Sequence, residues 1–410
     1  MQGKNKVYFR NTEKKIEKLI TEKKSALLFG PRQTGKTTLI KKILKNNPNT
    51  LNYPLQNPQI RSELERDPSR LIKQILSYPQ KQYVFIDEAQ KVPTLFDAAQ
   101  YLIDENKANF IITGSSARKL RRKGANLLPG RVKFFHLDPL LWNELGWTKQ
   151  QTIEEFNIDN KNDIPNYDFE KSLVFGSLPG IVALDNDIER QEILKAYTHI
   201  YLEEEIRAEA LSRKIGSFSR FLELAAQESG TNPNFAKLSM ETGVSAPTIK
   251  EFYNLLEDTL IIERIDPYLK NARKRILLSS RYYIFDLGVR NALARVPLAK
   301  ELINTDKGKL FEHAVVLEII RRIRSLNLNF QVYYWRTASG AEVDCVIDTG
   351  SQVIPIEIKS STSISVGKLK GLNSFLDEYQ KLAPKGFVIT NSRVPEQLTD
   401  KITAIPWQYF

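Results

Sequence analysis

Cysteine, histidine and long apolar runs are scarce in this chain of 410 residues. Its single cysteine, Cys345, excludes an intramolecular disulfide and fits a reducing compartment. The three histidines, His136, His199 and His313, are scattered and cannot build a zinc site with one cysteine. No run of about 18 apolar residues occurs, so we expect no transmembrane helix and no membrane partner. The charged N-terminus lacks the apolar segment of a secretory signal, and we therefore expect a cytoplasmic protein.

Positive charge is in excess, and it is unevenly distributed along the chain. The formal net charge is +12. Residues 1–140 carry a net +15 and residues 141–212 a net −9, whereas residues 213–300 carry +5 and residues 301–410 carry +1. A basic N-terminal region suits phosphate-rich partners, ATP and DNA among them. Solvated basic faces would give the same composition, so charge alone does not decide between these explanations.

The first 140 residues alternate short apolar runs with helical stretches. Strands that alternate with helices predict a parallel sheet with helices on both faces, which is an α/β fold. The predicted strands are 25–29, 50–55, 83–87, 109–113 and 132–137.

The remaining chain divides into three further regions. Residues 141–212 are acidic and helical, which suits a lid or a connector. In residues 213–300, three helices and two strands predict a winged helix-turn-helix. Residues 301–410 follow the order helix, three strands, helix, strand, which predicts an α/β sandwich. The helices expected in these regions are 218–230, 234–244, 245–259, 308–323 and 368–380.

The segment GPRQTGKT, residues 30–37, matches the phosphate-binding pattern G-x-x-x-x-G-K-[ST] in full. It follows a predicted strand and opens a predicted helix, and its glycines let backbone N–H groups surround a phosphate. Lys36 would reach the β- and γ-phosphates of ATP, and Thr37 would offer its hydroxyl to Mg²⁺. The residues predicted to bind ATP are Gly30, Pro31, Arg32, Gln33, Thr34, Gly35, Lys36, Thr37, Thr38 and Asp87.

Acidic and hydroxyl side chains end the next two apolar strands. Asp87 closes YVFID and would order the magnesium shell with Thr37, while Glu88 is placed to polarise an attacking water. Thr113 or Ser115, at the end of the following strand, could hold that water near the γ-phosphate. A helix-capping role for both would explain the same pattern.

Arginines follow this strand and could serve a neighbouring subunit. Arg131, just before the fifth strand, is where an arginine finger could reach the γ-phosphate bound by another copy. Arg118, Arg121 and Arg122 compete for that role, and solvated basic side chains are the alternative. This interpretation predicts a homo-oligomer.

The C-terminal region carries a second set of polar side chains. Asp344 lies on one predicted strand, and Glu357 and Lys359 lie two residues apart on the next, so both point to one face. Glu312 from the preceding helix could complete the pocket. Carboxylates of this kind bind Mg²⁺, and the lysine could activate water, as in phosphodiesterases with a D-x(n)-E-x-K pattern. A salt-bridged Glu–Lys pair without a metal is the simpler explanation.

In combination, these segments resemble a family of archaeal and bacterial AAA-type ATPases with a C-terminal restriction-endonuclease-like domain of unassigned role. The resemblance rests on LLFGPRQTGKTTL, YVFIDEAQKVP, FIITGSSARKL, LLPGR, GSLPG, LFEHAVVLEI and YYWRTASGAEVDCVI–PIEIKSS. It implies a RecA-like ATPase core, a winged helix and a PD-(D/E)xK nuclease fold. It also assigns Lys36, Thr37, Asp87 and Glu88 to ATP, and Glu312, Asp344, Glu357 and Lys359 to the nuclease-like site.

Three functions follow from this sequence. The first is Mg²⁺-dependent ATP hydrolysis coupled to DNA binding or processing through the nuclease-like domain. The second is an ATP-driven switch that assembles or signals through protein partners, with a nuclease fold that does not cleave. The third is a DNA-binding regulator in which the helix at 245–259 enters the major groove. That helix is rather acidic, which favours a protein-interaction role, and its phosphate contacts would come from Lys270, Arg273, Lys274 and Arg275.

Overall fold

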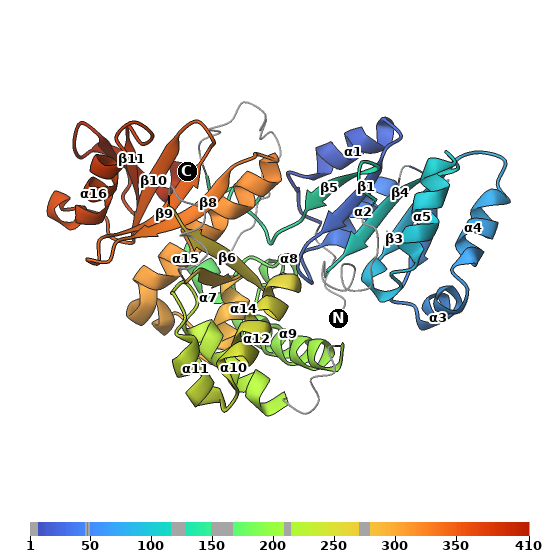
Figure 1. The fold of residues 1–410 in the computed structure, drawn as a ribbon, viewed down its shortest axis with the longest axis horizontal. Coiled ribbons are helices and arrows are strands. Elements are labelled where there is room, and N and C mark those ends of the chain that lie inside the picture. Colours follow the sequence, from blue (N-terminus) through green and yellow to red (C-terminus); the bar gives the residue numbers. More distant parts are fainter. Residues whose placement is uncertain are drawn as a thin grey trace. The chain divides into compact units, whose positions relative to one another are not determined.

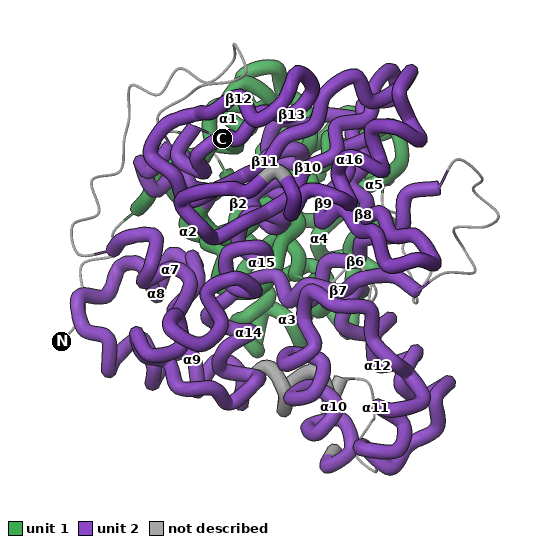
Figure 2. The backbone as a smooth tube through the Cα atoms, turned by 90° about the vertical axis from the view of Figure 1, so that its left-hand side faces the viewer, with its two compact units in different colours: residues 1–140, 258–261 green, residues 141–257, 262–410 purple. Residues whose placement is uncertain are grey.

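The computed structural model describes residues 7–45, 47, 50–115, 128–148, 167–208, 215–269 and 279–409. They form two compact units, shown in Figure 2. Unit 1 comprises residues 1–140 and 258–261, and unit 2 comprises residues 141–257 and 262–410. The buried apolar clusters of the described residues each lie within a single unit. Each unit therefore has a hydrophobic core of its own.

Unit 1 is built on a five-stranded parallel sheet of order β2-β3-β4-β1-β5. All five strands predicted from the apolar runs are confirmed, with ends that agree to within one residue. Because parallel strands share one direction, their carboxyl ends meet at one edge of the sheet. The strands are β1 Ser25–Phe29, β2 Thr50–Pro54, β3 Gln82–Asp87, β4 Ala108–Gly114 and β5 Val132–His136.

Helices pack on both faces of this sheet, as Figure 1 shows. On one face α3, α4 and α5 bury a cluster that includes Leu71, Phe96 and Phe110. On the other face α1 and α2 bury Ile16, Ile40 and neighbouring strand residues. The helices are α1 Glu13–Thr21, α2 Lys36–Leu44, α3 Pro58–Arg66, α4 Ser69–Leu76, the short 3₁₀ turn η1 Ala89–Lys91 and α5 Leu95–Asp104.

Unit 2 contains a mixed eight-stranded sheet of order β12-β13-β11-β10-β9-β8-β6-β7. The two strands expected as the wing, β6 and β7, pair with each other in antiparallel fashion. Strand β6 also pairs with β8 through Asp266 and Pro267, so the ribbon continues the C-terminal sheet. The strands are β6 Ile262–Pro267, β7 Arg281–Ile284, β8 Gln331–Arg336, β9 Glu342–Asp348, β10 Val353–Lys359, β11 Gly386–Thr390, β12 Glu396–Gln397 and β13 Ile402–Pro406.

The helices of unit 2 include the five that the sequence predicted. Asn234 caps the start of α11 through its side chain, and Gly243 ends this helix in the left-handed conformation. Phe218 and Phe252 pack edge to face between α10 and α12. The helices are α7 Phe169–Phe175, α8 Pro179–Val182, α9 Asp187–Ala208, α10 Ile215–Gln227, α11 Phe235–Thr242, α12 Ala246–Asp258, α14 Leu287–Leu293, α15 Glu301–Leu326, η3 Val366–Lys368, α16 Lys370–Glu378 and η4 Trp407–Tyr409.

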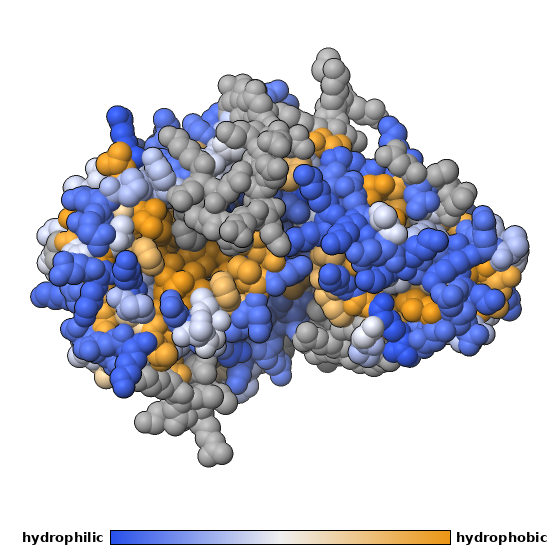
Figure 3. All heavy atoms as spheres, turned by 90° about the horizontal axis from the view of Figure 1, so that it is seen from above, coloured by the Kyte–Doolittle hydropathy of each residue, from blue (hydrophilic) through white to orange (hydrophobic). Residues whose placement is uncertain are grey.

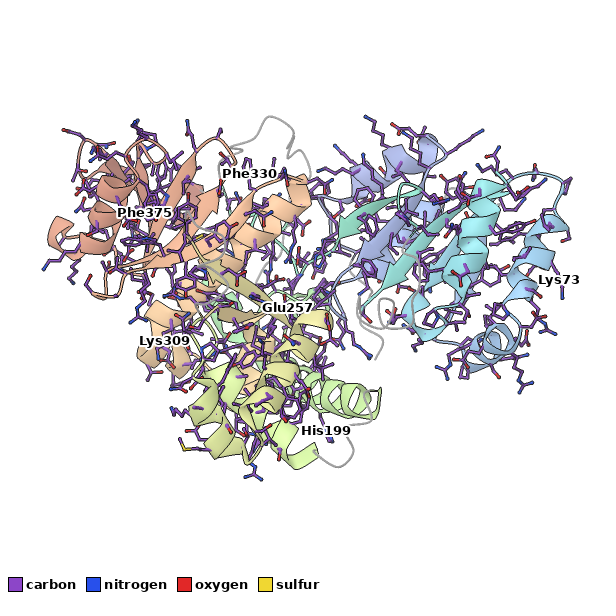
Figure 4. The ribbon with its side chains drawn as sticks, in the orientation of Figure 1. Lys73, His199, Glu257, Lys309, Phe330 and Phe375 are labelled. Carbon is purple, nitrogen blue, oxygen red and sulfur yellow. The ribbon has the colours of Figure 1, made fainter. Side chains whose placement is uncertain are left out.

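Two of these helices hold the C-terminal strands in place. Helix α15 has a kink at Asp306 and packs its apolar side into a buried cluster of unit 2. Phe375 of α16, labelled in Figure 4, packs edge to face on Trp335 of β8. These contacts help to fix the strands β9 and β10, which carry Glu342, Asp344 and Glu357.

The surface of the described residues is mostly hydrophilic, with scattered apolar patches in the view of Figure 3. In the described ranges, no helix combines the length and apolar character that a membrane crossing needs. The arginines predicted at 118, 121 and 122 and the basic residues predicted at 270 and 273–275 lie outside the described ranges.

Candidate functional site

The phosphate-binding loop joins β1 to α2 at the carboxyl edge of the sheet in unit 1. A Cβ atom at Gly30 would lie only 2.1 Å from the carbonyl oxygen of Leu137, so the close approach of these backbones requires glycine. Gly35 caps α2 with a φ of 92°, a left-handed conformation that side chains rarely adopt. The two glycines therefore set the loop's shape and place the amino end of α2 beneath it.

Lys36 is buried inside this loop. Its Nζ donates hydrogen bonds to the carbonyl oxygens of Gly30, at 2.8 Å, and Pro31, at 2.7 Å. Burial lowers the pKa of Lys36 to about 8, although Glu88 and Asp87 oppose this shift by favouring the charged form. A desolvated ammonium group of this kind is stabilised by an anionic ligand, and phosphate oxygens would supply one.

Two of the predicted residues, Thr37 and Thr113, donate hydrogen bonds to the carboxylate of a third, Asp87. The hydroxyl of Thr37 donates to both oxygens of Asp87, each at 2.9 Å. The hydroxyl of Thr113 donates to Asp87 Oδ1 at 2.6 Å and accepts from the backbone N–H of Glu88 at 3.2 Å. Hydroxyl and carboxylate oxygens are the ligands that Mg²⁺ takes in proteins, so Thr37 and Asp87 fit this ion.

Glu88 sits in the left-handed conformation, with a φ of 61°, directly after β3. Its Oε2 accepts hydrogen bonds from Gln90 Nε2, at 2.5 Å, and from the hydroxyl of Ser115, at 3.2 Å. Gln90 Nε2 also donates to the Ser115 hydroxyl at 2.8 Å. The carboxylate is thus oriented by two buried neighbours. The sequence left Thr113 and Ser115 as alternatives for the residue that holds the attacking water. It gave no indication of a role for Gln90 beyond its place in the segment YVFIDEAQ.

Arg10 is a further residue that the sequence did not single out. Its buried guanidinium donates from Nη1 to the carbonyl oxygen of Thr34, at 2.7 Å, and from Nη2 to that of Asp138, at 2.6 Å. One side chain from before α1 therefore ties the phosphate-binding loop to the segment that follows β5. Only the folded backbone brings these carbonyls together, so sequence spacing could not reveal the contact.

The other predicted loop residues occupy the same turn. The hydroxyl of Thr34 donates to the Pro31 carbonyl at 3.0 Å, and Gln33 has a φ of 62°. Arg32 is half-buried and Thr38 is exposed on the first turn of α2.

Arg131 lies at the opposite edge of the sheet. It precedes β5, and the first residue of β5, Val132, pairs with Ser25 at the amino end of β1. Its guanidinium forms two hydrogen bonds to Asp104, at 2.5 Å and 3.0 Å. Arg131 is therefore distant from the loop of its own unit, and the arginine-finger role stays a prediction.

Unit 2 brings the C-terminal acidic residues together. Lys359 Nζ lies 2.5 Å from Glu357 Oε1, and Asp344 Oδ2 accepts a hydrogen bond from the backbone N–H of Ile358 at 2.8 Å. Glu312 of α15 accepts a hydrogen bond from the hydroxyl of Tyr283 at 3.3 Å. We refer to Glu312, Glu342, Asp344, Glu357, Lys359 and Arg281 as the acidic cluster.

Burial disfavours the charged forms of the carboxylates in the acidic cluster, and these carboxylates also repel one another. Burial, followed by the charge of Asp344, raises the pKa of Glu357 to about 7 and that of Glu312 to about 8. Burial also raises the pKa of Asp344, against the opposing effect of Lys359. A cation would relieve this repulsion. Within the described ranges, however, no three His, Cys, Asp or Glu side chains are grouped so that they could hold a metal ion.

Arg281 is the unexpected member of this cluster. It pairs with Glu342, its Nη1 lies 3.8 Å from Glu312 Oε1, and its guanidinium stacks 4.5 Å from the ring centre of Tyr334. Burial would lower its pKa, but Tyr283, Glu342 and Glu312 outweigh burial and raise it, so Arg281 is charged. It starts β7, far from the other members in sequence, and no motif marks it.

Comparison with known protein families matches three successive parts of the chain. Residues 22–146 match a family described as an AAA domain. Residues 166–300 and 307–410 match two domains of unknown function, DUF8612 and DUF4143. Uncharacterized proteins of Mycobacterium bovis and Mycobacterium tuberculosis are each 25% identical over 400 residues, which are 97% of this chain and 83% of theirs.

Among solved structures, a Walker-type ATPase of Pyrococcus abyssi is similar. It is 16% identical with a TM-score of 0.47, and the match covers 70% of this chain and 96% of that one. The AAA family match coincides with the loop, strands and helices that surround Lys36 and Asp87. Residues 22–146 therefore form an AAA-type ATPase domain, which binds and hydrolyses a nucleotide.

Proposed function

We propose that this chain uses Mg²⁺-dependent ATP hydrolysis in unit 1 to control the binding or processing of DNA through the acidic cluster of unit 2. The observation that supports the second part is the burial of Asp344 and Glu357 beside Lys359. Carboxylates in such a place are unfavourable without a compensating cation, and their pairing with a lysine suits metal-assisted phosphodiester hydrolysis. The net charge of +12 is in keeping with a polyanionic partner.

At the nucleotide site, each side chain has a defined task. Lys36 exchanges its bonds to the loop carbonyls for bonds to the β- and γ-phosphates. Thr37 and Asp87 would hold a magnesium ion, which would neutralise charge on the phosphates, and Thr113 fixes the carboxylate of Asp87. Glu88 accepts a hydrogen bond from the attacking water through its carboxylate, and Gln90 and Ser115 orient that carboxylate. Arg131 of another copy would approach the γ-phosphate.

At the acidic cluster, Asp344 and Glu357 would hold a divalent cation, with Glu312 as the third ligand suggested by the sequence. The cation would supply charge stabilisation for a phosphodiester under attack. Lys359 holds Glu357 in place, and its Nζ would orient the attacking water or donate a hydrogen bond to the phosphate.

Cleavage of DNA tests this proposal. Supercoiled, linear and single-stranded DNA are incubated with the full chain, ATP and either Mg²⁺ or Mn²⁺. We expect cleavage by the wild type that Asp344→Asn removes. Asp348→Asn is the matched control because Asp348 ends the same strand and its carboxylate accepts a hydrogen bond from the turn N–H of Gly350, away from Asp344 and Glu357. Equal cleavage by wild type and Asp344→Asn would contradict a catalytic cluster.

A second function is favoured by the ion pairs inside the cluster. Lys359 pairs with Glu357 and Arg281 with Glu342, so the cluster already holds two internal cations. Such a network also suits a nuclease fold that does not cleave, in an ATP-driven switch with a protein partner or a second copy. Light scattering with and without ATP distinguishes the two: ATP-dependent assembly of a chain that cleaves no DNA supports the switch.

A further inference from the structure

Arg281 lies among the carboxylates of the acidic cluster rather than at the surface. Its side chain is only 5% exposed. Within the described part of the chain, its Nε and Nη1 atoms are buried without a hydrogen-bond partner. A buried guanidinium with unused donors is costly unless nearby negative charge compensates it. Glu342 and Glu312 supply that charge.

The cluster has two sides. On one side, Glu342 and Glu312 face Arg281, and Glu312 also accepts the hydrogen bond of Tyr283. On the other side, Glu357 contacts Lys359, and Asp344 is fixed by the backbone N–H of Ile358. Arg281 is the cation on the first side and Lys359 the cation on the second, but the two sides differ in which buried atoms of the described residues lack a hydrogen-bond partner.

The difference is an unused acceptor. Glu357 Oε2 is buried and has no hydrogen-bond partner among the described residues. Its carboxylate is therefore only half engaged by Lys359, which leaves an oxygen beside Asp344 for an additional ligand. On the Arg281 side, by contrast, the unused atoms are donors, and they repel a metal ion. A divalent cation is thus expected beside Asp344 and Glu357 but not beside Glu312 and Glu342.

We propose that Arg281 holds Glu312 and Glu342 as its counter-ions and so restricts the acidic cluster to a single divalent cation on Asp344 and Glu357. This inference rests on the metal-binding role proposed above and changes its ligand set. Glu312 becomes a positioning residue for Arg281, not a metal ligand. Arg281 belongs to β7, so the segment before the C-terminal region determines how many ions that region accepts.

Metal binding measured without catalysis tests this inference. Mn²⁺ is titrated into the nucleotide-free full chain, with calorimetry and the Mn²⁺ paramagnetic resonance signal as readouts. Mn²⁺ binding that is lost in Asp344→Asn is assigned to the acidic cluster. We expect Asp344→Asn and Glu357→Gln to weaken Mn²⁺ binding by at least about tenfold, and Glu312→Gln to change it by less than about threefold.

The arginine itself is tested by a charge-removing and a charge-retaining variant. Arg281→Gln removes the counter-ion that Glu312 and Glu342 share, although Glu342 keeps Arg336, whose Nε lies 3.6 Å from Glu342 Oε2. This variant should add a second equivalent of bound Mn²⁺, while Arg281→Lys should retain one. Arg264→Gln is the matched control, since Arg264 lies on the adjacent strand β6 and pairs with Asp266. Circular dichroism shows which variants are folded. If Arg281→Gln does not fold, the effect of Glu312→Gln on Mn²⁺ binding decides whether Glu312 is a metal ligand.

The outcomes separate this inference from the proposed function. Loss of Mn²⁺ binding in Glu312→Gln equal to that in Asp344→Asn would overturn the role of Arg281. A folded Arg281→Gln chain that still binds one equivalent would overturn it as well. A wild-type chain that binds no Mn²⁺ contradicts the metal site itself, and with it the inference.

Discussion

Burial fixes the protonation state of His313, a residue of α15 that packs against the ring of Tyr283. Its Nε2 lies 2.8 Å from the carbonyl oxygen of Ile284. Burial, with the nearby cations Arg290 and Arg321, lowers the pKa of His313 from 6.5 to about 3, although the carbonyl opposes the shift. His313 is therefore neutral in the folded chain.

The stability of unit 2 should fall as the pH drops below 6.5 because the unfolded chain then takes up a proton that folded His313 resists. At pH 5 this effect lowers the free energy of unfolding by about 2 kcal/mol relative to neutral pH. His313→Gln keeps a donor for the Ile284 carbonyl and removes the titration. Urea unfolding of both chains at several pH values measures the difference. Parallel stability curves for the two chains would contradict the burial of a neutral imidazole.

Gln90 provides the second prediction at this scale. Gln90→Met keeps the size of the side chain and removes its hydrogen bonds to Glu88 and Ser115. Because Glu88 then loses its orientation, kcat for ATP should fall by about tenfold while the affinity for ATP stays unchanged. Steady-state kinetics and binding of a fluorescent ATP analogue separate the two quantities. A change in affinity with unchanged kcat would instead assign Gln90 to the loop's structure.

The sequence predicted single residues only where a motif fixes both their type and their spacing. Lys36, Thr37 and Asp87 belong to such motifs, and the fold brings them together. Gln90 and Arg281 act through partners that are distant in sequence: Gln90 bonds to Ser115, and Arg281 pairs with Glu342. These contacts arise from the packing of strands that no local pattern relates.

At the scale of secondary structure, the junction between β1 and the phosphate-binding loop has no room for a side chain at Gly30. Gly30→Ala would place a methyl group 2.1 Å from the Leu137 carbonyl oxygen, which follows the neighbouring strand β5. Separating these backbones should lower the free energy of unfolding of unit 1 by at least about 2 kcal/mol and weaken ATP binding. Thermal unfolding and ATP titration measure both effects.

Gly180→Ala is the matched control for this prediction, since a Cβ at Gly180 meets no atom within 4 Å. It should leave both quantities unchanged. An equally stable Gly30→Ala chain with normal ATP binding would show that the junction tolerates a side chain.

Elements with a strong period or a long apolar run were predictable from sequence, and the rest were not. Strands β1 to β5 lie in short apolar runs between turn residues, so their ends followed from composition. Strand β13 and the short helices α7 and α14 are stabilised by tertiary contacts. Asn291 of α14, for example, donates hydrogen bonds to carbonyls of α7. The continuation of the β6–β7 ribbon into the C-terminal sheet also depends on a pairing of residues far apart in sequence.

At the scale of the whole chain, each of the two units has buried apolar clusters of its own. We therefore expect two unfolding transitions, of which only the one from unit 1 responds to nucleotide. A non-hydrolysable ATP analogue with Mg²⁺, at about 100 times its Kd, should stabilise unit 1 by about 2.7 kcal/mol.

Differential scanning calorimetry measures both transitions, and Lys36→Ala serves as the control that removes the response to nucleotide. A single transition that shifts as a whole would contradict independent cores.

The central claim is that the site around Lys36 and Glu88 hydrolyses ATP in the service of a DNA-directed function. The most direct test is ATP turnover at saturating Mg-ATP, with and without DNA, for wild type, Lys36→Ala, Glu88→Gln and the control Lys45→Ala, in which an exposed lysine at the end of α2 is removed. Our account predicts turnover that DNA increases, that Lys45→Ala retains, and that falls by at least about 100-fold in Lys36→Ala and Glu88→Gln. Turnover that persists in Lys36→Ala would contradict the site, and turnover that is indifferent to DNA would contradict the DNA-directed role.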